Sequence, residues 1–454
     1  MKRSFDDHVL DDLGQRLRPL TDDIAERYPG EPTDRQPVHT VYGGAQLFRS
    51  GTARRLGDLA LRELDRYAPD AAEFGDAIGL RTDDGLREVI YERVRDKLET
   101  EPVEDFRIDF EDGYGNRPDD EEDASAVAAA EAVADGMGSA ALPPFIGLRI
   151  KPLAGELYRR SISTLDIFVS TLLERTGGQL PDGFMVTLPK VMDPAEVAIF
   201  VDVLEQLELT VGLETGSLRL ELMIETPQSI IAGDGSSMLP ALVNAARGRC
   251  VGAHFGVYDY TAAAGISAQY QVMDHPACDF ARHMMKVALA GTGVMLSDGA
   301  TNVIPVAAHR VAADIELTQA QAQENRAAFH SAWKVHYEHV RHSLRHGFYQ
   351  GWDLNPAQLP TRYAAVYAFF LENVDAASQR LRNFVSVAAQ ATLVGEVFDD
   401  AATGQGLLNF FLRGLGCGAL SEAEVLETGL SLDELRGRSF AKILAGRRGE
   451  PVED

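Results

Sequence analysis

The feature that most constrains the fold is a regular alternation of short apolar segments with longer segments of helical periodicity. Eight apolar segments are predicted to be strands, the seventh being the least regular: Val38–Tyr42, Phe106–Phe110, Phe145–Ile150, Phe184–Leu188, Leu218–Ile224, Val251–Phe255, Val294–Leu296 and Phe348–Leu354. Their Val, Ile, Leu and Phe content is typical of parallel strands that are buried on both faces. The alternation therefore predicts an α/β fold, a (β/α)8 TIM barrel, with an open doubly wound sheet as its structural rival.

The segments between the strands carry recognisable helix signals. Residues 4–28 have the spacing of an amphipathic helix, and residues 316–346 are predicted to form one long helix. The sequence Asp193-Pro194-Ala195-Glu196 has an N-cap, a proline in the first turn and a glutamate that completes a capping box. The gap between the first two strands is long enough for two helices.

The chain after Arg362 is predicted to be helical throughout, with breaks at Gly404, Gly414 and Gly418. The pattern divides the chain into an N-terminal helical segment (1–36), a barrel (37–362) and an all-helical C-terminal extension (363–454).

Charge and cysteine content exclude several classes of function. The 454 residues include 69 acidic and 43 basic side chains, a net charge of −26, which opposes binding to nucleic acid or to anionic membranes. The three cysteines are widely spaced, so neither a disulfide framework nor a zinc ribbon is expected. The N-terminus is acidic where a signal peptide is apolar, and no apolar run is long enough to span a membrane. We expect a cytoplasmic protein.

Glycine-rich phosphate loops are missing from the sequence. The glycines of Val41-Tyr42-Gly43-Gly44 lack the GxGxxG spacing, and no GxxxxGK[ST] motif occurs. A nucleotide cofactor is therefore not expected.

Charged residues follow the predicted strands at the positions where a barrel places its chemistry, because the carboxyl ends of parallel strands meet at one rim. These residues are Glu111, Asp112, Arg149, Lys190, Glu225 and Asp259. Mg²⁺ prefers hard oxygen ligands and keeps several positions open for water or substrate, and Mn²⁺ is an alternative. Glu225 and Asp259 are the predicted metal ligands. Arg149 is the predicted stabiliser of an enolate formed from a 2-oxo or β-hydroxy acid.

The other rim residues allow both a functional and a structural interpretation. Glu111 and Asp112 either order metal-bound water or form a polar turn. Lys190 either binds substrate or pairs with a carboxylate, and a Schiff-base role is the third possibility. Gly43 and Gly44 either allow close approach of a substrate carboxylate or only turn the chain.

No general base can be assigned from the sequence. His254 lies within a predicted strand, where a hydrogen-bonded core histidine is the default, and His275 lies in a loop. The basic pairs Arg54-Arg55 and Arg159-Arg160 either contact phosphates of coenzyme A or are solvated. The acidic run Asp119–Asp123 is predicted to be a solvated helix start.

Six motifs in order along the chain resemble those of the HpcH/HpaI aldolase, citrate lyase β-chain and malyl-CoA lyase family, in the pyruvate/phosphoenolpyruvate barrel superfamily. The motifs are Arg107–Gly113, Gly147–Ile150, Val186–Lys190, Leu222–Thr226, Gly256–Tyr260 and Gly351–Gln358. The chain departs from the family where Val257-Tyr258 replaces a glutamate-containing pair, where Pro227-Gln228-Ser229 replaces a small turn, and where Asn355 replaces a histidine.

The resemblance implies a Mg²⁺-dependent carbon–carbon lyase or aldolase that acts on a small carboxylic acid or an acyl-CoA and assembles as a homo-oligomer. It also implies that Glu225 and Asp259 are the metal ligands and that Arg149 binds the enolate. Two alternatives stay open: a phosphoryl-transfer enzyme on the same barrel, and a non-catalytic barrel subunit.

Overall fold

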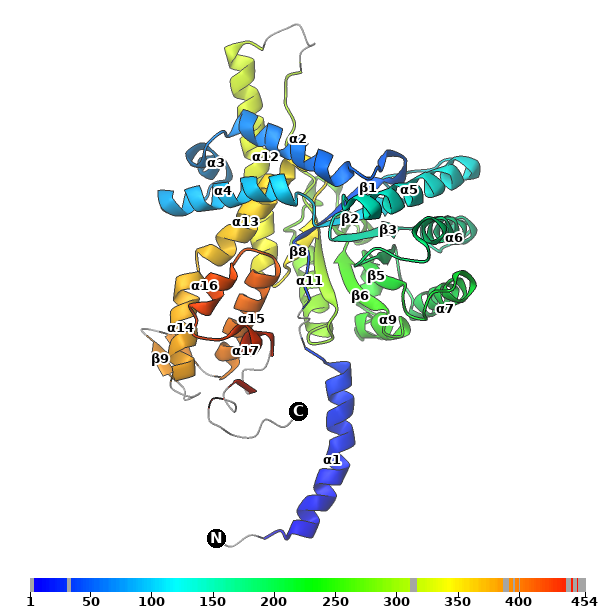
Figure 1. The fold of residues 1–454 in the computed structure, drawn as a ribbon, viewed down its shortest axis with the longest axis vertical. Coiled ribbons are helices and arrows are strands. Elements are labelled where there is room, and N and C mark those ends of the chain that lie inside the picture. Colours follow the sequence, from blue (N-terminus) through cyan, green and yellow to red (C-terminus); the bar gives the residue numbers. More distant parts are fainter. Residues whose placement is uncertain are drawn as a thin grey trace.

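The computed structural model describes residues 4–30, 34–310, 317–386, 392–394, 397–399, 401–437, 442–443 and 447, and its centre is a closed barrel (Figure 1). Eight parallel strands follow one another around the barrel in sequence order, and β8 pairs with β1 to close it. They are β1 (His39–Gly44), β2 (Asp105–Asp109), β3 (Phe145–Arg149), β4 (Met185–Leu188), β5 (Arg219–Ile224), β6 (Cys250–Phe255), β7 (Met295–Ala300) and β8 (Gln350–Trp352). Each overlaps a predicted strand, so the predicted (β/α)8 fold is confirmed.

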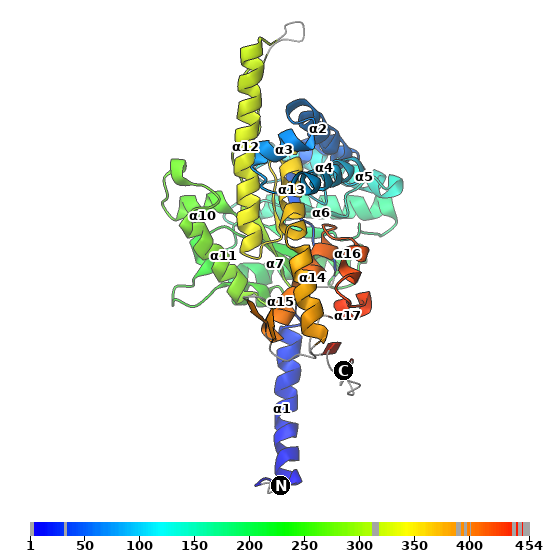
Figure 2. The same cartoon turned by 90° about the vertical axis from the view of Figure 1, so that its left-hand side faces the viewer.

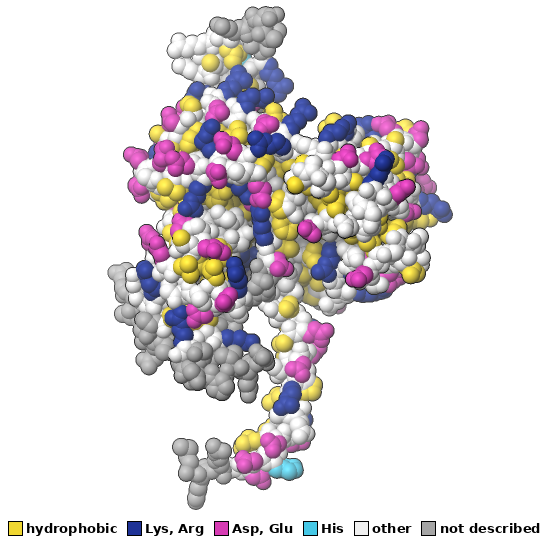
Figure 3. Space-filling model, in the orientation of Figure 1, with side chains coloured by type: hydrophobic (Ala, Val, Ile, Leu, Met, Phe, Trp, Pro, Cys, Tyr) yellow, Lys and Arg dark blue, Asp and Glu magenta, His cyan; other side chains and the backbone are white. Residues whose placement is uncertain are grey.

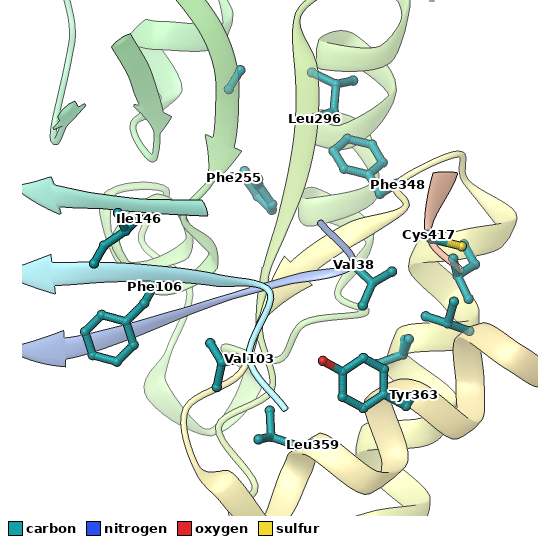
Figure 4. Packing of buried hydrophobic residues seen from close by; sticks show 14 of the residues in the cluster. Val38, Val103, Phe106, Ile146, Phe255, Leu296, Phe348, Leu359, Tyr363 and Cys417 are labelled. Atoms are coloured by element: carbon teal, nitrogen blue, oxygen red, sulfur yellow. The ribbon is translucent and has the colours of Figure 1, made fainter. Parts of the chain in front are cut away.

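The two faces of the barrel strands differ in chemistry. In β2, Phe106 and Ile108 are buried against the surrounding helices, whereas Arg107 reaches Thr187 of β4 and Glu221 of β5 inside the barrel. The strands are buried on both faces as expected, but the inner face also carries charged and polar side chains, whereas the outward face is apolar. Figure 4 shows part of the apolar layer, which joins barrel residues such as Val38 and Phe106 to Leu359 and Tyr363 of the helices.

Helices surround the barrel and connect its strands. They are α2 (Thr52–Tyr67), α3 (Ala71–Ile78), α4 (Asp84–Thr100), α5 (Asp119–Ser139), α6 (Leu157–Thr176), α7 (Pro194–Val211), α8 (Pro227–Ile230), α9 (Leu239–Ala245), α10 (Val257–Ala263), α11 (Pro276–Ala288), α12 (Gln319–Arg345) and α13 (Leu359–Leu371). Asp193 caps α7 as predicted, by accepting a hydrogen bond from the Ala195 amide. Between β1 and β2 there are three helices rather than two, because Asp70 caps the additional short helix α3.

One long helix connects β7 to β8, as predicted. This helix, α12, begins at a capping box formed by Thr318 and Gln321 and runs to Arg345. Its N-terminal half projects beyond the barrel (Figure 2).

A buried carboxylate holds the closing strands of the barrel together. Asp353 follows β8 and lies 3.1 Å from His39 Nδ1 of β1, 3.0 Å from His336 Nε2 of α12 and 2.8 Å from Arg362 Nη2 of α13. Burial alone would raise the pKa of Asp353, but Arg362 and the two histidines hold it well below its usual range. The closing "Gly351–Gln358" motif therefore has a structural role at this point.

The C-terminal extension differs in detail from its prediction. The boundary drawn at residue 362 falls inside α13, which continues to Leu371 without interruption. The extension contains α14 (Val374–Ser386), the short antiparallel strands β9 (Thr392–Val394) and β10 (Val397–Asp399), α15 (Ala401–Gly416), α16 (Glu422–Leu426) and α17 (Leu432–Arg436). Gly404 and Gly414 lie within α15 and do not break it, whereas Gly418, with φ +72°, follows its end.

The N-terminal helix α1 (Asp7–Arg27) matches the predicted helix and has no buried residue. It stands away from the barrel in both views (Figures 1 and 2), and hydrophobic side chains are exposed along it (Figure 3). Five of them recur at intervals of three and four residues: Leu10, Leu13, Leu17, Leu20 and Ile24. Among the described residues, no helix combines the length and the apolar character needed to cross a membrane.

Candidate active site

A layer of paired charges crosses the middle of the barrel. The guanidinium of Arg107 forms an ion pair with Asp105, and its Nε lies 3.5 Å from Glu221 Oε1. The same Glu221 oxygen accepts hydrogen bonds from Thr187 Oγ1 at 2.7 Å and Tyr42 OH at 3.1 Å. Burial alone would raise the pKa of Glu221, but Arg107 and these hydrogen bonds lower it. Arg107, Asp105 and Glu221 are buried, so one guanidinium serves two carboxylates, and burial raises the pKa of Asp105.

Arg149, at the end of β3, lies above this layer at the carboxyl rim. Its Nε and Nη2 donate to the two oxygens of Asp109 at 2.8 and 2.6 Å, and its Nη1 lies 3.0 Å from Glu111 Oε2. The guanidinium carbon is 4.8 Å from the ring centre of Tyr42 and 5.4 Å from that of Trp352. Two hydrogen bonds and two aromatic faces therefore fix the orientation of this cation.

Asp109 is a site residue that the sequence interpretation did not single out. Its oxygens also accept hydrogen bonds from the backbone amides of Glu111 at 3.0 Å and Gly113 at 2.8 Å, which fold the β2–α5 loop around the carboxylate. A Cβ at Gly113 would lie 2.7 Å from Asp109 Oδ2, so the close approach needs glycine. The signal available in the sequence was the alternation Asp105-Phe106-Arg107-Ile108-Asp109, which places this acid on the inner face.

The two predicted metal ligands follow neighbouring strands: Glu225 comes directly after β5, and Asp259 lies half-exposed in the first turn of α10, which follows β6. Glu225 is 2% exposed, and its Oε1 accepts a hydrogen bond from the Lys190 amide at 2.7 Å. Burial raises the pKa of Glu225 above its usual range, and the negative charges of Glu111 and Asp259 raise it further. Gly256 makes room for this carboxylate, because a Cβ there would lie 2.6 Å from Glu225 Oε2.

Lys190 connects the carboxylates of the rim. Its φ of +54°, in the left-handed region, turns the backbone amide toward Glu225. Its ammonium contacts Glu111 and lies 3.5 Å from Asp259 Oδ2. Burial alone would lower the pKa of Lys190, but Glu111 and Glu225 raise it above its usual value. A lysine that stays protonated is an ion-pair partner rather than a Schiff-base nucleophile.

The rim carries more negative than positive charge. Three carboxylates (Glu111, Glu225 and Asp259) surround one ammonium group, while Arg149 is already paired with Asp109. Glu111 Oε2 is buried and has no hydrogen-bond partner among the described residues, although Arg149 Nη1 is close. This set of hard oxygen donors fits Mg²⁺ or Mn²⁺. An ion held by two carboxylates keeps coordination positions open for water and substrate.

Comparison with known proteins places the chain in a family of unassigned role. A family model described as "Domain of unknown function (DUF6986)" matches residues 17–443. The chain belongs to this family. The match includes both the barrel and most of the extension. No curated protein matches the chain.

Solved structures of known enzymes resemble this DUF6986 member. A citrate lyase from Burkholderia xenovorans LB400 is 16% identical, with a TM-score of 0.55 over 87% of this chain and 97% of that one. Native malate synthase from Haloferax volcanii at 3 mM glyoxylate is 15% identical, with a TM-score of 0.46 over 90% of this chain and 98% of that one. The likeness to the citrate lyase shows a shared barrel fold, in agreement with the resemblance of the six motifs.

The remaining predicted rim residues lie at the margin of the site. The Asp112 side chain is 64% exposed and 3.9 Å from both Arg149 Nη2 and Lys190 Nζ. Gly44 packs against the β2–α5 loop, where a Cβ would lie 2.3 Å from the Gly113 carbonyl oxygen. A Cβ at Gly43 would meet the ring of Phe106 at 2.5 Å, so packing on the outer face accounts for that glycine.

The two histidines have different positions. His275 is the N-cap of α11, and its Nδ1 accepts a hydrogen bond from the Ala277 amide at 3.0 Å. His254 lies inside the barrel with Nδ1 3.4 Å from Tyr42 OH, and burial lowers its pKa to about 4. His254 is therefore neutral at pH 7.

Three polar groups inside the barrel are buried without a hydrogen-bond partner among the described residues. They are His254 Nε2, Ser297 Oγ and Trp352 Nε1. His254 pairs with Ser297 in the β6–β7 register, and the rings of His254 and Trp352 are 5.7 Å apart. Buried polar groups are rarely left unpaired, so this side of the barrel has the donors and acceptors for a polar ligand or for water.

One arginine of each basic pair, together with the acidic run, forms ion pairs within the protein. Arg160 forms ion pairs with Asp119, Glu122 and Asp123, which join α6 to the start of α5. Glu122 is 1% exposed and also pairs with Lys151, so the prediction of a wholly solvated run was wrong at this residue. Arg54 pairs with Asp58 on α2.

Proposed function

We propose that this protein is an enzyme, a Mg²⁺-dependent carbon–carbon lyase or aldolase that cleaves or condenses a 2-oxo or β-hydroxy acid, or its CoA thioester, through an enolate. The observation that carries the proposal is the buried Arg149, held at two points by Asp109 next to three carboxylates that share one lysine. A fixed cation beside a negatively charged metal site is what an enolate intermediate requires.

Glu225 and Asp259 would hold the ion, and Glu111 Oε2, which has no hydrogen-bond partner among the described residues, would accept a hydrogen bond from water bound to it. Bound Mg²⁺ would supply Lewis-acid polarisation of the substrate carbonyl. Lys190 keeps these carboxylates together through its amide and its ammonium group, and the three carboxylates share its positive charge.

Arg149 would donate a hydrogen bond from Nη1 to the substrate oxygen that becomes negative as the carbon–carbon bond breaks or forms. Asp109 orients the guanidinium before the substrate arrives, so no reorganisation is needed at the moment of reaction. Tyr42 and Trp352 cover the cation and exclude water from it. A single donor of this kind contributes about 10²–10³-fold to a rate.

The unpaired groups of His254, Ser297 and Trp352 would bind other polar atoms of the substrate. A neutral His254 can donate one hydrogen bond, as can the indole of Trp352, whereas the Ser297 hydroxyl both donates and accepts.

We also infer a cytoplasmic homo-oligomer. The exposed stripe of α1 has the 3–4 spacing of a coiled-coil seam, which supports association with α1 of a second copy. Light scattering of the full chain and of Leu13→Glu/Leu17→Glu tests this, because the variant should have the lower mass at equal concentration. Equal masses would contradict the inference.

The proposed activity is tested by titrating metal-stripped protein with Mg²⁺ and Mn²⁺, in the presence and absence of oxalate, which mimics the enolate of pyruvate. We expect one ion per chain, tighter binding with oxalate, and loss of binding in Glu225→Gln and Asp259→Asn. Asp112→Asn, which removes an exposed carboxylate from the same rim, is the matched control. Wild-type protein that binds neither metal nor oxalate would refute the proposal, whereas oxalate binding would direct a search for pyruvate release from 2-oxo and acyl-CoA substrates.

A further inference from the structure

A cluster of histidine and aspartate side chains lies between α11 and α12, on the outside of the barrel. Asp279 belongs to α11, and His342 and His346 lie in the last turn of α12 and just after it. One ligand atom from each lies within 4.8 Å of the others. The cluster is separate from the carboxyl rim, because both helices contact Asp298 on the outer face of β7, through Arg282 and Ser343.

The contacts within the cluster leave metal-binding atoms available. His342 Nε2 is 2.7 Å from Asp279 Oδ1. His346 Nδ1 is 2.9 Å from the carbonyl oxygen of His342 and donates to it, which leaves Nε2 of His346 as the atom with a free lone pair. A histidine that donates one ring nitrogen to a carbonyl and offers the other is the usual arrangement of a metal ligand.

The spacing of the residues also fits a metal. His342 and His346 are four residues apart, so their side chains lie on one face of the helix, as the two histidines of HExxH zinc sites do. Their ring centres are 4.3 Å apart. His283, one turn after Asp279 on α11, adds a third ring 5.1 Å from that of His346.

Asp279 is ionised, and Arg282 on the same helix holds its side chain in place. Arg282 Nη1 donates to its Oδ1 at 3.0 Å, and Arg282 itself is anchored on Asp298 of β7. Burial alone would raise the pKa of Asp279, but His342 and Arg282 lower it. Both of these partners use Oδ1, so Oδ2 remains for a cation.

We propose that Asp279, His342 and His346 bind one zinc ion, with water in the fourth position. Two imidazoles and one carboxylate are a donor set that suits Zn²⁺, whereas Mg²⁺ prefers oxygen ligands only. The ion replaces the direct His342–Asp279 hydrogen bond with two coordinate bonds and so joins α11 to α12. The site is independent of the rim and of the reaction proposed there.

The test is a titration of the metal-stripped full chain with Zn²⁺ in competition with a chromogenic chelator, followed by Co²⁺ as a spectroscopic probe. We expect one tight Zn²⁺ per chain at pH 7.5, a higher unfolding temperature with Zn²⁺, and the visible absorption of four-coordinate Co²⁺. His342→Ala and His346→Ala should each weaken Zn²⁺ binding on the order of 100-fold or more, because a ligand contributes at least as much as an outer partner.

Three further variants make the result specific. His8→Ala, an exposed histidine on α1, should bind Zn²⁺ as wild type does. Glu225→Gln/Asp259→Asn should also keep the Zn²⁺ site, which separates it from the proposed Mg²⁺ site. Asp279→Asn, which preserves side-chain shape, should lose about tenfold or more in affinity without loss of fold. Equal Zn²⁺ affinity of wild type, His342→Ala and Asp279→Asn would overturn the proposal.

Discussion

Glu221 lies on β5 and Glu225 directly follows that strand, and both are 2% exposed, yet their pKa values shift in opposite directions. Burial would raise both. At Glu221 the guanidinium of Arg107 and three polar neighbours overcome burial, and the carboxyl stays ionised. At Glu225 two other carboxylates add to the effect of burial, and one shared lysine does not compensate.

The opposite pKa shifts distinguish a structural layer around Glu221 from a binding layer around Glu225 in the same barrel. The middle layer pairs its groups within the protein, because Arg107 contacts both Asp105 and Glu221 while burial raises the pKa of Asp105. The rim keeps unbalanced negative charge, which is costly unless a cation arrives. Four predictions test this contrast, in order of decreasing effect.

Replacing Arg107 should have the largest effect on stability. Arg107→Leu leaves Asp105 and Glu221 buried without a cation, and breaking a buried pair in this way costs about 3–5 kcal/mol. Urea unfolding of the metal-stripped protein measures it. The triple variant Arg107→Leu/Asp105→Asn/Glu221→Gln should recover much of the lost stability. An Arg107→Leu protein as stable as wild type would contradict the distinction between the two layers.

Arg149→Lys should affect the reaction more than the fold. The charge remains, but lysine cannot replace the two-point contact with Asp109, so the fixed donor is lost. We expect a 10²–10³-fold lower kcat, about 2.7–4 kcal/mol. Until a substrate is known, weaker oxalate binding to the Mg²⁺-loaded protein is the measurement. Unchanged oxalate affinity would show that Arg149 serves only the ion pair with Asp109.

Raising the pH should reduce the contribution of Glu225 to the stability of the metal-free protein and should increase the affinity of the protein for Mg²⁺. Because its pKa is raised on folding, its contribution to stability is complete below its unfolded pKa and is lost as pH rises through the folded value. Glu225→Gln should therefore become more stable relative to metal-free wild type between pH 5 and 9, by at least about 1.4 kcal/mol.

Mg²⁺ affinity of the wild type should rise over the same interval, by up to about tenfold per pH unit, because the ion displaces the Glu225 proton. Chemical denaturation and metal titrations at several pH values give both slopes. A stability difference between Glu225→Gln and wild type that does not change with pH would contradict the proposed cause.

Asp112→Asn should have the smallest effect. Its carboxylate is 64% exposed and 3.9 Å from the nearest cations, so stability should change by less than about 0.5 kcal/mol. Mg²⁺ affinity should stay within about threefold of wild type, which is at most about 0.65 kcal/mol. A loss of Mg²⁺ affinity as large as that of Asp259→Asn would show that Asp112 is part of the metal site.

The sequence was sufficient for the barrel and for the rim, because strand spacing and strand ends are local properties. Glu111, Arg149, Lys190, Glu225 and Asp259 come together as the strand-end rule predicts. The ligand and catalytic roles given to them remain predictions.

Contacts between segments that are distant in the sequence could not be predicted from the sequence. Asp109 is a site residue only because β3 places Arg149 beside it, and Glu122 is buried only because Lys151 and Arg160 meet it. The role of His275 as a cap depends on where α11 begins. Gly404 and Gly414 were expected to break a helix, but helical glycines can be tolerated where packing supports the helix: a Cβ at Gly414 would meet the Leu420 side chain at 2.6 Å.

The buried middle layer also gives the barrel a closed end. Beneath it, Gln350, Thr40 and Gln36 fill the interior, and Arg413 of α15 contacts Gln36 at the far end. On the proposed function, substrate would therefore enter and product would leave from the rim side. A product would then compete with substrate for the same site, and a long thioester chain would place only its acyl end inside.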